Sequence, residues 1–421
     1  MQFYQILSKT KNDPALVIYF LSQIGVNLFE NIFVKIVCGG NKSCLAWYNE
    51  VNSTKEKMKI AIDVQTTLGQ PTGFGFYVSN LTKALKKFSS DNEFELIRPD
   101  AEKDFSTPQR FYWDQFVYPA KARLAKVNLL HQPCFSAPLL FKGPVVITIH
   151  DIISILFPEN IPFASRMFYS KWMPFTYNKA NRIITISQST KNDITRVLKI
   201  PQEKITVIPL AVDEKFEKPI KSDEVENVRR KYGLPEKYIL HIGTLEPRKN
   251  LKFLIDVFSE VIKSEKNSDL NLVITGKKGW YYEGLFERVR ELGLEKKIIF
   301  TGYVDELDKP AIYKGAKIFA FPSVYEGFGL PPLEAMASGV PVISSDTSSM
   351  GEVIADAGIL LPPNDVGRWI KAIGRLNNDE SLCKKYIELN KRQIKNFSWE
   401  RAARETIEVY KKAYADYKKT N

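Results

Sequence analysis

The stretch FPSVYEGFGLPPLEAMASGVPVIS, residues 321–344, contains the pattern that decides the fold class. It begins at the end of an apolar run, continues through a turn with Gly327 and Gly329, and enters a helical segment at Pro331 and Pro332. Proline suits the first turn of a helix, because the backbone N–H groups there have no partner within the helix. A second apolar run closes the stretch. A strand, a helix and a strand in this order predict a βαβ unit of a parallel sheet.

The same alternation of short apolar runs and longer amphipathic stretches extends along the chain in both directions and forms two series. The predicted strands are 59–64, 94–97, 128–131, 145–149, 183–187 and 205–208 in the first series, and 238–242, 272–275, 298–301, 318–321, 341–344 and 359–361 in the second. The sequence therefore predicts an α/β protein with two Rossmann-like parallel-sheet domains that face each other across a cleft.

The two series set the predicted domain boundaries. The first domain is expected at residues 58–212 and the second at residues 238–396, with a polar, charged linker at residues 213–237 between them. Residues 397–421 form a last amphipathic helix, for which Ser398 is the predicted N-cap.

Residues 1–57 form an N-terminal extension without a comparable pattern. Its most apolar part, from Pro14 to Phe29, gives way to polar residues before it reaches the ~20 residues that a membrane-spanning helix needs. It also lacks a small-residue cleavage site after a basic start, so we do not interpret it as a secretory signal. We predict that Met58 is the natural start, because the run after it reads as the first strand of a domain.

Composition and cysteine usage narrow the class of protein. The 421 residues are 44% hydrophobic and 26% charged, which is typical of a globular protein with substantial cores. The four cysteines (Cys38, Cys44, Cys134 and Cys383) are too widely spaced for a disulfide framework, and with three histidines they offer no zinc spacing. We therefore expect a cytoplasmic protein in a reducing environment, without a bound metal.

The formal net charge of +12 predicts an anionic partner. The sequence contains no helix-turn-helix, zinc finger or RNP-like run, so we do not expect nucleic acid to be that partner. Aromatic residues gather in the stretch 110–118. The cations near it in sequence are Lys83, Lys86, Lys87, Lys121, Arg123 and Lys126. This pattern fits either peripheral contact with the inner face of a membrane or a core stripe beside a solvated basic side, and both interpretations stay open.

The turn and helix start within residues 321–344 predict an anion-binding site. Unpaired N–H groups and the positive end of the helix dipole at such a position favour a diphosphate. Glu326 on the turn and Glu334 in the first part of the helix can each accept protons from sugar hydroxyls. Alternatively, Glu334 is only a favourable acid near a helix start and Glu326 a solvated loop residue.

A second strand-to-helix turn, GTLEPRKN at residues 243–250, places two adjacent cations after a strand. Arg248 offers a bidentate fork and Lys249 a point charge, and together they suit a diphosphate. A leaving nucleoside diphosphate needs such neutralisation. An ordinary solvated basic turn is the alternative.

Taken together, these motifs resemble those of a known family. Glu326 to Glu334 is similar to the Glu-x7-Glu signature of retaining glycosyltransferases of the GT-B fold, and with residues 243–250 the match is to glycosyltransferase family 4. The resemblance covers residues 58–415 and includes several further stretches in the expected order. They are 63–75, 148–151, 183–189, 207–209, 302–304, 349–353 and 397–399.

The resemblance implies a role for each of these residues. Glu326 would contact the donor sugar, Arg248 and Lys249 the diphosphate, and His150 would lie near the reacting sugar. Together these four would form the catalytic group. The terminal helix would cross back onto the first domain. In the glycine loop after the first strand, Phe76 replaces the family's frequent basic residue. The expected donor-binding residues are Gly73, Gly75, Thr244, Tyr303 near the base, Gly327, Phe328, Gly329, Leu330 and Glu334 at the ribose.

The resemblance also implies an activity. It predicts a retaining enzyme that moves a hexose from a nucleotide-diphosphate sugar to a glycan or lipid-linked acceptor in polysaccharide or glycoconjugate synthesis. The sequence looks like mannosyltransferases of surface polysaccharide assembly, which makes GDP-mannose a candidate donor. No cofactor or metal is expected, because no Asp-x-Asp motif occurs and two cations can replace a magnesium ion. The alternatives are a glycoside hydrolase using Glu326 and Glu334 as acid and nucleophile, and a non-catalytic module that binds a sugar nucleotide or a membrane.

Overall fold

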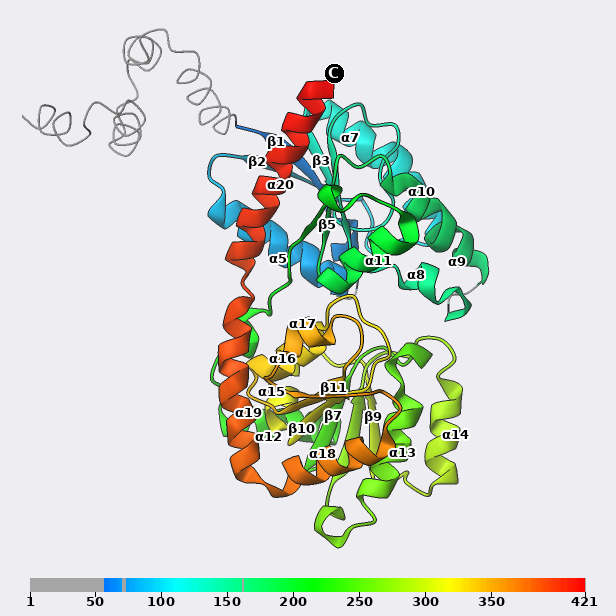
Figure 1. Ribbon diagram of the computed structural model, residues 1–421, viewed down its shortest axis with the longest axis vertical. Coiled ribbons are helices and arrows are strands. Elements are labelled where there is room, and N and C mark those ends of the chain that lie inside the picture. Colours follow the sequence, from blue (N-terminus) through cyan, green and yellow to red (C-terminus); the bar gives the residue numbers. More distant parts are fainter. Residues whose placement is uncertain (1–56, 70–72, 161–162, 421) are drawn as a thin grey trace, which may run out of the picture. The chain divides into compact units, whose positions relative to one another are not determined.

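A computed structural model describes residues 57–69, 73–160 and 163–420. The predictions for residues 1–56, including the extension and its apolar run, lie outside the described residues. From Lys59 on, the chain contains two six-stranded sheets flanked by helices (Figure 1). Every pairing between the named strands is parallel. The predicted α/β fold with two parallel-sheet domains is confirmed.

The first sheet has the strand order β2-β1-β3-β4-β5-β6. Its strands are rich in Ile and Val, and β4 is buried along its whole length, as expected where helices cover both faces. The strands are β1 Lys59–Asp63, β2 Glu93–Ile97, β3 Leu129–Gln132, β4 Val145–Ile149, β5 Arg182–Thr185 and β6 Ile205–Val207.

The second sheet has the strand order β12-β11-β10-β7-β8-β9. Its strands are β7 Tyr238–Ile242, β8 Asn271–Thr275, β9 Ile298–Gly302, β10 Ile318–Phe321, β11 Val342–Ser345 and β12 Ile359–Leu361. Every predicted strand overlaps one of those observed in the two sheets. Apolar runs bounded by Gly, Pro or polar residues therefore located the strands well.

Helices occupy most of the connections between strands, and the final three helices of the chain follow β12. Those of the first half are α5 Gly73–Phe88, α6 Thr107–Tyr112, α7 Tyr118–Leu124, α8 Ile153–Leu156, α9 Phe163–Met167, α10 Met173–Tyr177 and α11 Gln188–Leu198. Those that follow are α12 Ser222–Tyr232, α13 Leu251–Val261, α14 Glu283–Glu291, α15 Lys309–Gly315, α16 Leu330–Ala337, α17 Met350–Ile354, α18 Val366–Asn378, α19 Glu380–Gln393 and α20 Trp399–Thr420. None of these described helices is long and apolar enough to cross a membrane.

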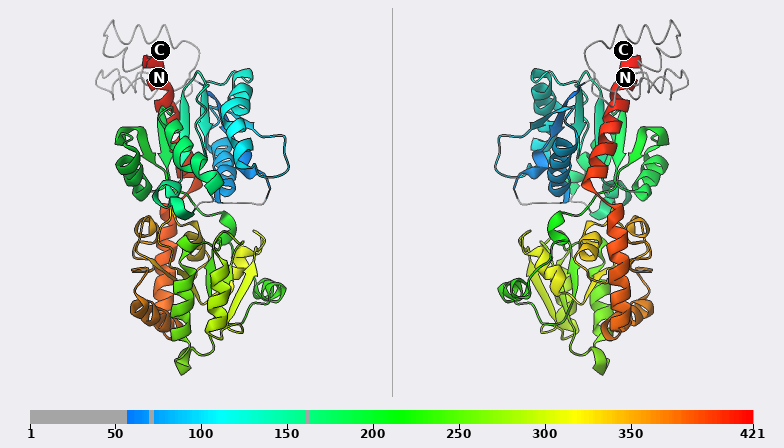
Figure 2. Two further views of the ribbon diagram at one scale, coloured as in Figure 1. Left: turned by 90° about the vertical axis from the view of Figure 1, so that its right-hand side faces the viewer. Right: turned by 90° about the vertical axis from the view of Figure 1, so that its left-hand side faces the viewer.

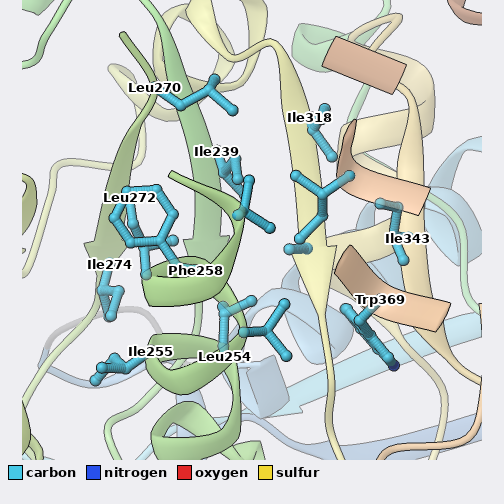
Figure 3. Close-up of a cluster of buried hydrophobic side chains, with 14 of the residues drawn as sticks. Ile239, Leu254, Ile255, Phe258, Leu270, Leu272, Ile274, Ile318, Ile343 and Trp369 are labelled. Atoms are coloured by element: carbon cyan, nitrogen blue, oxygen red, sulfur yellow. The ribbon is translucent and has the colours of Figure 1, made fainter. Parts of the chain in front are cut away.

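The core of the second half lies between its sheet and the helices α13 and α18. Leu254, Ile255 and Phe258 of α13 and Trp369 of α18 are fully buried against strand residues such as Ile239 (Figure 3). The apolar spacing within α13 puts these side chains on one helical face. This packing holds the strand ends, and the loops that follow them, in fixed positions.

The last helix, α20, packs on the first sheet and on α5, as the views in Figures 1 and 2 also show. Ser398 precedes it, and its hydroxyl accepts a hydrogen bond from the Arg401 N–H at 3.1 Å, so the predicted N-cap is present. Within the helix, the Tyr410 hydroxyl lies 2.7 Å from Nδ1 of the buried His131 on β3. The chain thus returns from the second half to the first.

Residues 213–237, predicted as a linker, contain secondary structure of their own. The helix α12 lies within this stretch and packs against α15 of the second half. Tyr232 at its end donates a hydrogen bond of 2.7 Å to Asp308. The charged composition that suggested a linker is that of a surface helix with one packed side.

Candidate functional site

The strand order of the second sheet locates a ligand site before any side chain is considered. Read from β9 through β7 to β12, the order is that of a dinucleotide-binding fold, and it reverses between β7 and β10. Ligands of such sheets bind at the carboxyl ends of the strands beside this reversal. The segments that follow β7 and β10 are the two motifs singled out in the sequence, GTLEPRKN and residues 322–329.

Backbone contacts join these two segments directly. The Arg248 carbonyl accepts a hydrogen bond from the Val324 N–H at 3.0 Å and lies 3.2 Å from the Ser323 hydroxyl oxygen. In return, Arg248 Nη1 donates to the Tyr325 carbonyl at 2.7 Å. The short 3-10 helix Pro247–Lys249 therefore lies against the turn that carries Glu326.

The charged side chains meet at Glu326. Its Oε2 lies 2.7 Å from Arg248 Nη1, and its Oε1 lies 2.6 Å from Lys249 Nζ. The Ser323 hydroxyl donates to Oε1 as well. On its other side, Arg248 Nη2 lies 2.5 Å from Glu246 Oε1. The four charged side chains are at most 14% exposed, so water screens their interactions weakly.

The electrostatics fix the charge state of this cluster. Burial alone would raise the pKa of Glu326, but the charges of Arg248 and Lys249 outweigh it and lower the pKa to about 2. Burial and the neighbouring Arg248 lower the pKa of Lys249, although Glu326 opposes this shift. A carboxylate of this kind accepts hydrogen bonds at neutral pH and has no proton to give. Glu326 is therefore unsuited to the role of acid in a glycoside hydrolase.

The turn between Glu326 and α16 depends on its glycines. A Cβ on Gly327 would lie 2.3 Å from the carbonyl oxygen of His150, so no other residue fits there without a shift of the backbone. Gly329 has a φ of 121°, which side chains disfavour. Ser349 anchors the turn, since its hydroxyl donates to the Phe328 carbonyl at 2.5 Å and lies 2.9 Å from the Glu326 carbonyl. The start of α16 is thus held beside the cations.

Glu334 lies in a different environment from Glu326. It is 4% exposed and accepts a hydrogen bond of 2.8 Å from the Tyr313 hydroxyl of α15. Burial raises its pKa, opposed by the charge of Lys309 and the bond from Tyr313. Among the described contacts, none joins the side chains of Glu326 and Glu334. The structure brings Glu326 together with Arg248 and Lys249, and it places Glu334 apart from them.

His150 follows β4 and reaches the same region from the first half. Its Nε2 donates to the Pro133 carbonyl at 2.9 Å, which leaves Nδ1 as an acceptor in the neutral ring. The ring packs against Phe74 and Tyr77, with centroids 4.9 and 4.7 Å away. Burial lowers its pKa to about 4, so the ring is neutral at physiological pH. The His150 backbone faces Gly327, but its ring does not contact Glu326 in the described structure.

The remaining predicted donor-site residues occupy varied positions. Gly73 opens α5, and a Cβ there would meet nothing within 4 Å, so its small size is not required by packing. Phe76, which stands where the family often has a cation, packs on Trp399 at 5.9 Å between ring centroids. Gly75 and Phe328 are buried, whereas Thr244, Tyr303 and Leu330 are partly buried.

Comparison with known proteins agrees with this geometry. The family model described as glycosyl transferases group 1 matches residues 224–393, and that of glycosyltransferase family 4 matches residues 75–216. An O-antigen chain mannosyltransferase B of Escherichia coli is 34% identical over 287 residues, which cover 68% of this chain and 74% of the relative. The chain belongs to glycosyltransferase family 4.

Other relatives and solved structures extend the comparison. The glycosyltransferase is 30% identical over 267 residues to the serotype-specific mannosyltransferase WbdA of Escherichia coli, of whose length it covers 32%. Sucrose-phosphate synthase from Thermosynechococcus elongatus shares its fold with a TM-score of 0.69 at 20% identity, over 86% of this chain and 100% of that one. The Anabaena HepE protein, solved in complex with UDP and glucose, has a TM-score of 0.63 at 18% identity. The match covers 84% of this chain and 99% of that one. The predicted GT-B fold is confirmed.

Three side chains in or around the candidate site had no role in the sequence interpretation. Glu246 and Ser323 hold Arg248 and Glu326 in place. Glu352 of α17 accepts hydrogen bonds of 2.7 Å from both the Gln188 and the Ser189 N–H at the start of α11, which links the two halves. Glu246 lies two residues before Arg248, and a carboxylate so close in sequence to a predicted cation indicates an ion pair with it. Glu352 and its partners lie in the stretches 349–353 and 183–189, which match the family, but the sequence does not indicate that these two stretches meet.

Proposed function

We propose that this glycosyltransferase moves a hexose, with retention at the anomeric carbon, from a nucleotide-diphosphate sugar to a hydroxyl of a glycan or lipid-linked acceptor. The observation that carries the proposal is the contact of Arg248 and Lys249 with Glu326 at the strand-order reversal. The cluster pairs two cations with two carboxylates, Glu246 and Glu326. The guanidinium fork of Arg248 and the ammonium of Lys249 suit a diphosphate. The carboxylate of Glu326 suits the hydroxyls of the attached sugar.

Each group has a defined task in the proposed transfer. Arg248 and Lys249 bind the diphosphate and stabilise the negative charge that grows on it as the glycosidic bond breaks. Glu326 accepts hydrogen bonds from the sugar hydroxyls. The acceptor hydroxyl attacks the anomeric carbon on the face that the diphosphate leaves, and its proton passes to the departing phosphate oxygen. The neutral ring of His150 positions the sugar through Nδ1, and Glu334 binds the ribose.

The choice of donor rests on the relatives. The name of the Escherichia coli O-antigen chain mannosyltransferase favours mannose, and hence GDP-mannose, for polysaccharide synthesis. The HepE structure contains UDP and glucose, which supports a nucleoside diphosphate as the leaving group in this fold. We propose that the reaction needs no metal, because the two cations can neutralise the diphosphate.

A donor screen tests the proposal. The enzyme is incubated with GDP-, UDP- and ADP-sugars and a panel of glycan acceptors, and nucleotide release and the anomeric configuration of the product are measured by NMR. We expect release of the nucleotide with one class of donor. The product should keep the anomeric configuration that the sugar has in the donor, and EDTA should not lower the rate. An inverted product would contradict retention. Binding of a donor without release on any acceptor would favour the non-catalytic module.

A further inference from the structure

Two helical segments of the first half expose apolar side chains beside cations, and we propose that they form a docking face for an anionic lipid bilayer. The segments are the continuous helical stretch α6 to α7, with the π-helical turn Trp113–Val117 between them, and the stretch α9 to α10, with the π-helical turn Phe168–Trp172. The basic aromatic face is defined by the exposed residues Tyr112, Phe116, Leu124, Leu140, Met167 and Phe175 with the cations Lys121, Arg123, Lys126, Lys142 and Lys171.

Ring contacts connect the two segments into one surface. Tyr112 packs on Phe116 at 5.5 Å, and Phe111 lies 6.4 Å from Phe116 and 5.0 Å from Trp172 across the segments. Trp172 in turn lies 5.9 Å from Phe175. Phe116 and Phe175 are nonetheless 47% and 63% exposed, so their partners do not cover them. The aromatic rings form a continuous band that solvent reaches.

The sequence spacing of Lys121 and Lys171 places them on the same side of their helical segments as the exposed apolar side chains. In the α9 to α10 stretch, Met167, Lys171 and Phe175 follow one another at intervals of four residues, and all three are exposed, so they lie on the outer side of this stretch. In the other stretch, Lys121 comes five residues after Phe116, and a π-helical turn widens the repeat by about one residue. Each segment therefore presents apolar and basic side chains on the same side.

The two helical segments contribute no exposed acidic side chain of their own. Over residues 105–142 the sequence has one carboxylate, Asp114, and it is fully buried; residues 163–182 contain none. The nearby carboxylate of Asp104 is exposed but paired with Arg110. A face with exposed cations and with exposed aromatic and aliphatic tips complements the headgroup region of an anionic bilayer. It fits a neutral or basic partner poorly. This charge complementarity is why we choose a lipid surface over a second copy of the basic chain.

The structure also divides the basic residues that the sequence grouped together. Trp113 and Tyr118 of the aromatic stretch are buried in the core, so the core-stripe interpretation holds for them. Lys86 and Lys87 belong to α5, which packs with α20 rather than with α7 or α10. They are not part of the basic aromatic face.

Vesicle flotation tests the proposal with the full chain. Wild-type protein is mixed with vesicles of phosphatidylglycerol and phosphatidylcholine or of phosphatidylcholine alone. One double variant, Phe116→Ser with Phe175→Ser, removes apolar contact, and another, Lys121→Gln with Lys171→Gln, removes charge. A matched control, Leu307→Ser with Lys296→Gln, changes exposed residues of the same types in the second half.

We expect wild type and control to float with the anionic vesicles only, and each face variant to bind at least tenfold less at an unchanged thermal midpoint. Absence of wild-type binding, or equal loss in the control, would overturn the proposal. Sedimentation velocity tests the alternative that a second copy of the chain, rather than a bilayer, covers this face. A concentration-dependent dimer that the face variants abolish, without any vesicle binding, would assign the face to a second copy and would also overturn it.

Discussion

Arg248 Nη1 lies 2.7 Å from Glu326 Oε2, and this contact joins the loops that follow β7 and β10. The two strands are neighbours in the sheet although some 75 residues separate them in the sequence. The parallel pairing therefore brings a cation from one motif to a carboxylate from the other. The proposed donor chemistry depends on this juxtaposition.

Replacing Glu326 tests the role of the carboxylate. The substitution Glu326→Gln keeps the size of the side chain but removes the carboxylate that Arg248 and Lys249 share, and leaves Arg248 paired with Glu246 alone. We expect turnover to fall by ~100-fold or more, the scale for losing a charged group that acts on the transition state. Affinity for the nucleoside diphosphate should be kept or improved, because the cations are freed. Steady-state kinetics and calorimetry measure the two effects.

The exposed Glu287 of α14 provides the control for this experiment. Glu287→Gln removes a carboxylate of the same type that has no contact with the charged cluster in the described structure, and we expect it to leave turnover unchanged. Wild-type turnover in the Glu326 variant would exclude the proposed role.

Glu334 should affect donor binding more than turnover. Glu334→Gln removes a buried carboxylate, and the KM for the donor should rise about 10-fold or more, since a hydrogen bond to a charged group contributes about 1.5–3 kcal/mol. Tyr313→Phe removes the 2.8 Å hydrogen bond to Glu334 and should give a smaller change of the same kind. A large loss in kcat with an unchanged donor KM would assign Glu334 to the chemical step instead.

Glu352 connects α17 to the first turn of α11. Its carboxylate accepts from the Gln188 and Ser189 N–H groups, at the end of α11 where negative charge is favourable. Because the contact is solvent-exposed, Glu352→Ala should lower the free energy of unfolding by only about 0.5–1 kcal/mol. Hydrogen exchange at residues 188–190 should accelerate. The surface pair Arg401 with Glu405 is a control, and Glu405→Ala should leave exchange at residues 188–190 as in wild type.

Much of the fold follows from local patterns in the sequence, whereas the details of the site depend on tertiary contacts. Strands such as β4 and β7 are short apolar runs with turn signals at their ends, so burial and turn chemistry predict them directly. The pairing of Lys249 with Glu326 could be anticipated only as proximity, because sheet order sets it. The separate environment of Glu334, with Tyr313 of α15 as its partner, depends on how two helices pack. No sequence pattern reports that packing.

Asp114 predicts a specific pH dependence of stability. Burial and the charge of Asp63 raise its pKa from 3.8 to about 8, although hydrogen bonds from Ser136 and Gln65 oppose this shift. Between pH 4 and 8 the folded state therefore holds a proton that the unfolded state has released, so stability falls as pH rises through this window. As pH rises through this window, the free energy of unfolding of wild type should fall by up to about 1.4 kcal/mol per pH unit relative to that of Asp114→Asn. Urea unfolding of both proteins at pH 5 and pH 8 measures this difference, and parallel changes in the two would contradict the assignment.

A crystal structure of the enzyme with the nucleoside diphosphate of its accepted donor tests the proposed site most directly. We predict that the phosphate oxygens lie within hydrogen-bonding distance of Arg248 and Lys249, beside the start of α16, with the Glu326 carboxylate facing the position of the sugar. A nucleotide bound elsewhere, with Arg248 and Lys249 still paired to Glu326 and free of phosphate, would contradict it.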